Sequence, residues 1–69
     1  MLSQRETRMF KELCYGAIET NKMIREFGHR FSATKHTLNT KLSAHGMNIV
    51  NSVSIPDSNQ WIYWIGGRA

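Results

Sequence analysis

The spacing of apolar residues changes at Gly46, and this change constrains the fold more than any other feature of the chain. Before Gly46, apolar residues recur three or four positions apart, which is the period of a helix with one buried face. After it, Met47, Ile49, Val53 and Ile55 alternate with mostly polar residues, which is the period of a half-buried strand. The sequence therefore predicts an α+β domain with helices first and strands second.

The first predicted helix opens at Ser3 and ends at Gly16. Ser3 and Glu6 have the spacing of a capping box, in which each side chain bonds to the other residue's backbone N–H. The apolar positions of this helix follow helical spacing, and we expect them in the core; they are Met9, Phe10, Leu13 and Cys14. We expect Cys14 to act as a small buried apolar residue rather than as a nucleophile.

A second helix is predicted to end at Phe27, after a cap at Thr20 or Asn21. Residues 17–19, which precede it, form a short bridge with one or two residues of strand character. Gly28 opens the turn into the next helix. The second and third helices thus form a helix–turn–helix pair.

The third helix is predicted at residues 32–45. Ser32 is a suitable N-cap, and Gly46 is suited to the left-handed conformation that closes a helix. Leu38 and Leu42 lie four apart and should form the buried face. The opposite face is short and polar, without acidic or large apolar residues; it holds Ala33, His36, Thr37, Thr40 and Ser43, with Asn39 at its edge.

The remaining residues predict a β-hairpin. The alternating segment 47–55 is followed by a turn cluster at 56–60 and by the aromatic strand 61–65. Residues 66–69 are expected to form a frayed tail. Residues 1–69 are therefore expected to form a single domain of three helices followed by a two-stranded hairpin.

The charges favour a negatively charged partner for the third helix. The chain has 69 residues, a net charge of +4 and five acidic residues, none of them between Gly28 and Pro56. Arg30, Lys35, Lys41 and all three histidines lie in that interval. A polar face inside a positive field suits the DNA major groove. The alternative is a solvated face on an ordinary helix.

Other classes of function lack their sequence signals. A 69-residue chain has little room for a substrate pocket, so we do not expect an enzyme. A single cysteine allows no internal disulfide and favours a reducing, cytoplasmic location. No apolar run has the length of a membrane span, so no membrane association is expected. The histidines and the cysteine lack metal-ligand spacing, and there is no glycine-rich phosphate loop, so we expect neither a metal nor a cofactor.

The order helix, short strand, helix, turn, helix, strand, turn, strand resembles the winged helix-turn-helix DNA-binding family over residues 2–65. The segment around Met9, Phe10 and Leu13 is similar to the first helix of response-regulator output domains. Residues 20–27 resemble their second helix, residues 32–42 their recognition helix and residues 49–65 their wing. Lys35 departs from the pattern, because many family members have an apolar residue there.

The resemblance implies a role for each part of the third helix and the wing. The helix would enter the major groove, with Ala33, His36, Thr37 and Thr40 facing base edges. Phosphate contacts would come from Arg30, Ser32, Lys35 and Lys41. At the wing tip, Asn59 and Gln60 would reach a minor groove, although phosphate would repel the neighbouring Asp57.

Two hypotheses follow. The first is a small sequence-specific protein that binds double-stranded DNA and regulates transcription in a bacterium or its phage, as a homodimer on paired half-sites. The second is a protein-interaction module on the same fold, an inhibitor or adaptor, that grips a protein partner with the aromatic strand 61–65. In that strand Trp61 and Trp64 lie on opposite faces, so one of them should be exposed for contact. The alternative is that the tail or the first helix covers the second face.

Overall fold

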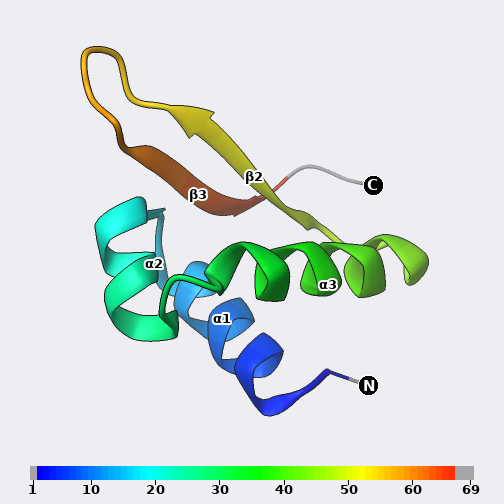
Figure 1. Cartoon of the computed structure of the whole chain (residues 1–69). Coiled ribbons are helices and arrows are strands. Elements are labelled where there is room, and N and C mark those ends of the chain that lie inside the picture. Colours follow the sequence, from blue (N-terminus) through cyan, green and yellow to red (C-terminus); the bar gives the residue numbers. More distant parts are fainter. Residues whose placement is uncertain (1, 67–69) are drawn as a thin grey trace.

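The computed structural model describes residues 2–66, which form three helices and a three-stranded antiparallel sheet (Figure 1). The elements are α1 (Gln4–Tyr15), β1 (Ile18–Glu19), α2 (Thr20–Phe27), α3 (Phe31–Ala44), β2 (Ile49–Ser54) and β3 (Trp61–Gly66). The β2–β3 hairpin rises away from the helices, as Figure 1 shows. The prediction of an α+β fold, with helices before the hairpin, is confirmed.

The sheet has one strand more than the predicted hairpin. Strand β1 pairs with β3 through Ile18–Tyr63 and Glu19–Ile62, so the strand order is β1-β3-β2. A two-residue strand is too short to show an alternating pattern, and pairing with β3 defines it. Gly66 is the last residue of β3, opposite Ile49, and is not part of a tail. The rest of the predicted tail, 67–69, lies outside the described residues.

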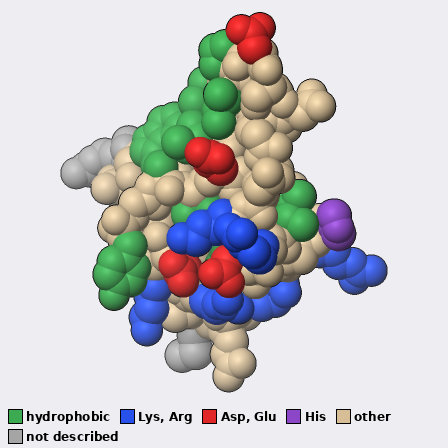
Figure 2. All heavy atoms as spheres, turned by 90° about the vertical axis from the view of Figure 1, so that its left-hand side faces the viewer, with side chains coloured by type: hydrophobic (Ala, Val, Ile, Leu, Met, Phe, Trp, Pro, Cys, Tyr) green, Lys and Arg blue, Asp and Glu red, His purple; other side chains and the backbone are tan. Residues whose placement is uncertain are grey.

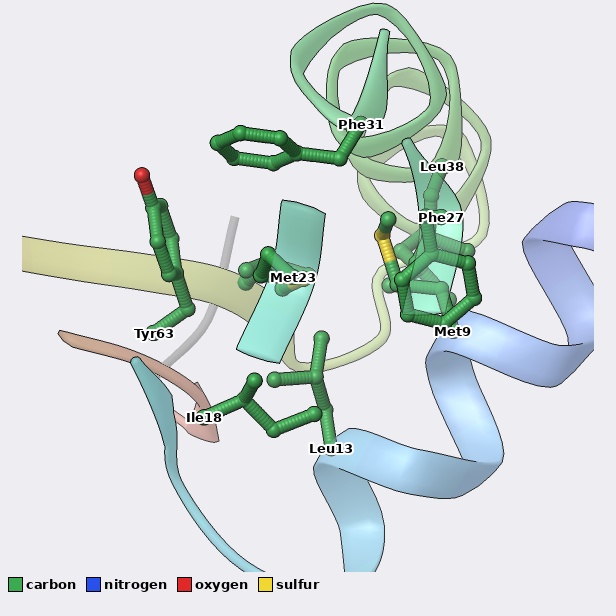
Figure 3. Packing of buried hydrophobic residues seen from close by; sticks show 10 residues of the cluster. Met9, Leu13, Ile18, Met23, Phe27, Phe31, Leu38 and Tyr63 are labelled. Atoms are coloured by element: carbon green, nitrogen blue, oxygen red, sulfur yellow. The ribbon is translucent and has the colours of Figure 1, made fainter. Parts of the chain in front are cut away.

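All three helices and all three strands contribute to one core (Figure 3). Its buried residues are Met9, Leu13, Ile18, Met23, Phe27, Phe31, Leu38, Leu42, Val50 and Tyr63. The Phe31 and Tyr63 rings meet edge to face, with centroids 5.7 Å apart and planes at 76°. This geometry is a favourable one for aromatic pairs. The start of α3 is thereby packed against the central strand of the sheet.

Two of the predicted helix ends are confirmed in atomic detail. The Ser3 hydroxyl accepts from the Glu6 N–H at 3.1 Å, and the Glu6 carboxylate accepts from the Ser3 N–H at 2.6 Å. At the end of α3, Gly46 is left-handed with φ 66°. The Met47 N–H then bonds to the Leu42 carbonyl at 2.9 Å, and the Gly46 N–H to that of Ser43 at 3.0 Å. This pair of bonds is a Schellman motif, which closes the helix.

The predicted helix starts at Ser32 and at Thr20 or Asn21 are wrong. Helix α3 begins at Phe31, and its N-cap Arg30 makes no side-chain cap bond. The Phe31 ring packs into the core from the first turn of α3. Ser32 is therefore the second residue of the helix and not its N-cap. Helix α2 begins at Thr20 itself, whose hydroxyl bonds to β3 instead of capping the helix.

Cys14 is exposed, which corrects the prediction that it is buried. Met9 and Leu13 lie four apart on α1 and take the centre of its buried stripe. One further residue turns the chain about 100° around the helix axis, which carries Cys14 out of that stripe. The next side chain, Tyr15, is 91% exposed. No helix within residues 2–66 has the length and apolar character needed to cross a bilayer.

Candidate nucleic-acid interface

One long side of α3 is open to solvent, and we call it the outer face of α3. Its exposed residues are Ser32, Ala33, His36, Thr37, Thr40 and Ser43. The face is exposed because Phe31, Leu38 and Leu42 on the other side of the helix are buried in the core. It carries hydroxyl groups, an imidazole and a methyl group but no acid, so it offers no repulsion to a polyanion.

The threonine hydroxyls on this face already use their protons. The Thr37 hydroxyl donates to the Thr34 carbonyl at 3.0 Å, and the Thr40 hydroxyl donates to the His36 carbonyl at 3.1 Å. A hydroxyl that donates to the backbone keeps acceptor capacity on its oxygen. In this arrangement the two threonines present acceptors and methyl groups to the outside. Among the described residues of the face, His36 and the hydroxyls of Ser32 and Ser43 can still donate.

Lys41 was expected to contact phosphate, but it forms an ion pair within the domain. Its ammonium lies 2.8 Å from the Glu6 carboxylate, whose side chain is only 5% exposed. Hydrogen bonds from the Lys41 ammonium and from the Ser3 backbone lower the pKa of Glu6 from 4.5 to about 2. The pair joins α3 to α1 and fixes the rotation of α3. The Glu6 carboxylate also compensates the charge of Lys41, so Lys41 adds little positive field to the site.

Lys35 lies over an aromatic ring, at the position where an apolar residue was anticipated. Its ammonium is 5.4 Å from the centre of the Tyr63 ring. The stem of a lysine can cover apolar surface while the charge stays at its edge. This packing explains how the helix accepts a charged residue here. Lys35 is half-buried and lies on the side of α3 that faces the hairpin.

The other edge of the outer face meets strand β2. Asn39 accepts from the Val50 N–H at 2.7 Å and donates to the Val50 carbonyl at 3.1 Å. Asn39 is therefore a link between helix and sheet rather than an open recognition residue. A shallow hollow lies between α3 and the start of β2, lined by His36, Asn39, Thr40, Ser43 and Ile49.

A second hollow lies at the start of α3 and is positively charged. It is lined by Arg5, Phe27, Gly28, His29, Arg30, Ala33 and Thr34. The Arg5 guanidinium bonds to the Phe27 carbonyl and, at 3.3 Å, to the Thr34 hydroxyl, and both of these partners are uncharged. Arg30 is exposed and was a predicted contact. We call Arg5, His29 and Arg30 the cationic hollow.

Sequence reasoning missed Arg5 and His29 as members of this site. Arg5 is 29 positions away from Thr34 in sequence, and nothing in its local pattern distinguishes it from a solvated arginine. The acid nearest in sequence to the turn, Glu26, is ion-paired with Arg8 at 2.9 Å. The cationic hollow therefore keeps its positive charge.

The hairpin turn contains Asn59, which is exposed, and Gln60, which is tied to the helices. The Gln60 side chain accepts from the Asn21 N–H at 3.2 Å, in the first turn of α2. Beside it, the Thr20 hydroxyl accepts from the Trp61 N–H at 2.7 Å and donates to the Trp61 carbonyl at 3.2 Å. Of the two predicted hairpin contacts, only Asn59 is free of such a tie within the described residues.

The face of the hairpin turned away from the helices carries three apolar residues, Val53, Ile62 and Trp64, which we call its back face, together with Asn51. Val53 is 49% exposed and Trp64 is 37% exposed. Figure 2 shows hydrophobic side chains in a band along the hairpin, with an acidic side chain at its border and lysine and arginine side chains below. Trp61 is 46% exposed but lies on the other face, beyond the end of the core.

Comparison with known protein families, with curated proteins and with solved structures found no match to the chain. Its chemistry therefore has to be inferred from the arrangement of its own residues. Within residues 2–66, no three histidine, cysteine, aspartate or glutamate side chains lie close enough together to hold a metal ion.

Proposed function

We propose that this chain is a small winged helix-turn-helix protein that binds double-stranded DNA and regulates transcription. The observation that carries the proposal is the outer face of α3: a long, exposed, acid-free surface that ends at the cationic hollow. The α2–α3 pair and the hairpin supply the helix–turn–helix and the wing of that architecture. The ion pair to Glu6 and the link to Val50 hold the helix in one orientation.

In the proposed complex α3 lies in the major groove. His36 and Thr40 are directed at base edges near the middle of the helix, and the Ala33 methyl meets a thymine methyl. Arg5, His29 and Arg30 hold the phosphates at the start of the helix, where they set register without reading sequence.

The remaining predicted contacts take smaller parts in this proposal. Lys35 acts through its field, because its partner, the Tyr63 ring, is uncharged. The charge of Lys41 is compensated by Glu6, and Lys41 serves to hold α3 in place. Asn59 is the hairpin residue placed to reach the DNA, while Gln60 keeps the hairpin attached to α2.

Fluorescence anisotropy with a random duplex across a salt series tests the proposal. The native chain should bind at low salt and weaken as salt rises. Arg30→Ala should make the slope of log K against log salt shallower by about one, since one phosphate contact releases about one counterion. Lys11→Ala is the matched control, because Lys11 is an exposed cation on α1 that lies outside the hollow.

Two results would contradict the DNA proposal. One is the absence of binding at low salt. The other is an equal loss of slope in Arg30→Ala and Lys11→Ala, which would mean that only net charge matters.

A protein-interaction module is the second candidate, and the exposed back face favours it. Val53 and Trp64 expose apolar area that a monomer would normally cover. If the native chain binds no duplex, the first test is a pull-down in which the native chain and Trp64→Ala are used as bait in parallel and the proteins they capture are compared. Loss of a captured protein in the variant would support this reading, and equal capture by both chains would reject it.

A further inference from the structure

Strand β2 has an unpaired outer edge. It lies at one side of the sheet, and in an antiparallel strand every second residue directs its N–H and C=O away from the paired neighbour. Val50 is such a residue, since both of its groups bond to Asn39. By the same alternation Ser52 and Ser54 direct their backbone groups outward. Within residues 2–66 nothing bonds to those groups.

The features that usually protect such an edge are missing. Natural edge strands are commonly blocked by charged side chains, proline or a bulge. Strand β2 has the sequence Ile-Val-Asn-Ser-Val-Ser, without charge or proline, and its register with β3 is uninterrupted. Asn39 blocks the edge only at Val50. Over the half of β2 nearest the turn, no helix or strand formed by residues 2–66 lies beyond it (Figure 1).

We propose that two copies of this chain associate by pairing their β2 strands antiparallel, in a register centred on Val53. In this register Ser52 of one copy faces Ser54 of the other. The two-fold axis creates a second, identical pair, in which Ser54 of the first copy faces Ser52 of the second. Each of these two pairs exchanges two backbone hydrogen bonds. Four bonds form in all, and the same edge serves both partners, as a two-fold interface requires.

The neighbouring residues disfavour the other registers. A register centred on Ser52 would place Ser54 against Val50, whose backbone groups are already held by Asn39. A register centred on Ser54 would place Ser52 against Pro56, which has no N–H to donate. In each of these registers only one residue pair exchanges two backbone hydrogen bonds, whereas two residue pairs do so in the register centred on Val53.

Side chains on the back face support the same register. Val53 faces its own counterpart in a non-hydrogen-bonded pair, where side chains approach most closely. The back faces then join into one apolar surface across the two copies, with Ile62 next to Val53 in each. No charged residue lies within either β2 strand. The pairing uses no residue of the outer face of α3 and does not depend on the DNA proposal.

Cross-linking tests the register directly. Val53→Cys in a Cys14→Ser background should form an intermolecular disulfide on mild oxidation, because the two side chains would be adjacent. Asn59→Cys in the same background is the control, an exposed position on the same hairpin but outside the paired segment. Cross-linking at Val53 no faster than at Asn59 overturns the proposal.

Analytical ultracentrifugation over a concentration series tests the edge itself. The native chain should show a monomer–dimer equilibrium. Ser54→Pro removes an outward N–H without touching the ladder to β3, so the variant should fold and associate at least about tenfold more weakly. Val53→Lys should do the same through like-charge repulsion, whereas Val53→Thr should associate as the native chain does. A chain that stays monomeric, or a dimer that Ser54→Pro and Val53→Lys leave unchanged, overturns the proposal.

Discussion

Asn39 holds both backbone polar groups of Val50, with its oxygen 2.7 Å from the N–H and its nitrogen 3.1 Å from the carbonyl. One side chain on a helix thus replaces the strand that would otherwise pair with β2 at this point. Thr20 does the same on the other side of the sheet, where its single hydroxyl serves both the N–H and the carbonyl of Trp61. The sheet is joined to α3 and α2 through these two residues.

We expect Asn39→Ala to lower the free energy of unfolding by about 1 to 3 kcal/mol, because it leaves the polar groups of a buried strand residue unpaired. Urea denaturation measures this loss. Asn48→Ala is the matched control, since Asn48 is exposed and makes no hydrogen bond within the described residues. A loss below about 0.5 kcal/mol, the size expected for an ordinary surface substitution, would mean that water replaces Asn39 at no cost.

Thr20→Val should loosen the hairpin where β3 begins. Valine keeps the shape of threonine but cannot bond to Trp61, so we expect about 1 to 2 kcal/mol of lost stability. The Trp61 amide should also exchange with solvent faster than in the native chain, which hydrogen exchange followed by NMR would detect. Unchanged exchange at that amide would show that the Thr20 bonds do not protect it.

Stability should fall in acid through Glu6. Its pKa is lowered to about 2 in the folded chain, mainly by Lys41, and is 4.5 ordinarily, so the unfolded chain takes up a proton first. The stabilisation is complete above pH 4.5 and is lost as the pH falls to about 2. The difference in urea midpoint between the native chain and Glu6→Gln should therefore shrink across that window. A difference that stays constant with pH would assign the effect to other groups.

Lys41→Ala should destabilise the chain more than Lys35→Ala. Removing Lys41 leaves the Glu6 carboxylate without its ionic partner in a nearly buried position, and we expect a loss of about 1 to 2 kcal/mol because the lysine end is partly exposed. Removing Lys35 forfeits only a contact with the Tyr63 ring, about 0.5 to 1 kcal/mol. Thermal unfolding of the two variants compares them, and the reverse order would contradict this assignment of the pairs.

If the DNA proposal holds, His36→Ala should weaken the binding free energy for a DNA site obtained by selection by about 1 to 3 kcal/mol. Binding to a random duplex should change little. His45→Ala is the matched control. His45 borders a hollow formed with Leu2, Phe10 and Met47, away from the outer face of α3. Equal losses on selected and random duplexes would remove His36 from base recognition.

The sequence predicted well the features that a local pattern encodes. The capping box at Ser3, the helix stop at Gly46 and the burial of Leu38 and Leu42 each depend on residues within one or two helical turns. The alternation after Gly46 placed the hairpin for the same reason. The N-cap of α3 is Arg30, two residues before the predicted Ser32, because a long-range contact of Phe31 with Tyr63 outweighed the capping preference of Ser32.

The candidate site was less predictable, because pairs distant in sequence decide which charges remain open. Lys41 meets Glu6 from 35 positions away, and Arg5 meets Thr34 from 29. Neither spacing has a signature in the chain. Sequence therefore identified the outer face of α3 as polar and acid-free, while the tethering of Lys41 and the contribution of Arg5 required the fold.

The strand order has a consequence for how the chain reaches its native state. Residues 61–66 are the last to be synthesised among those that the structure describes, yet they form the central strand and supply Tyr63 to the core. Without β3, Phe31 lacks its contact with the Tyr63 ring, and Ile18 lacks the strand with which it pairs. Closing the loop between Ile18 and Tyr63 is a slow, entropically costly step compared with forming the helices. A nascent chain halted before Trp61 should therefore remain a loosely packed set of helices, and release of that last strand should trigger folding as a single event.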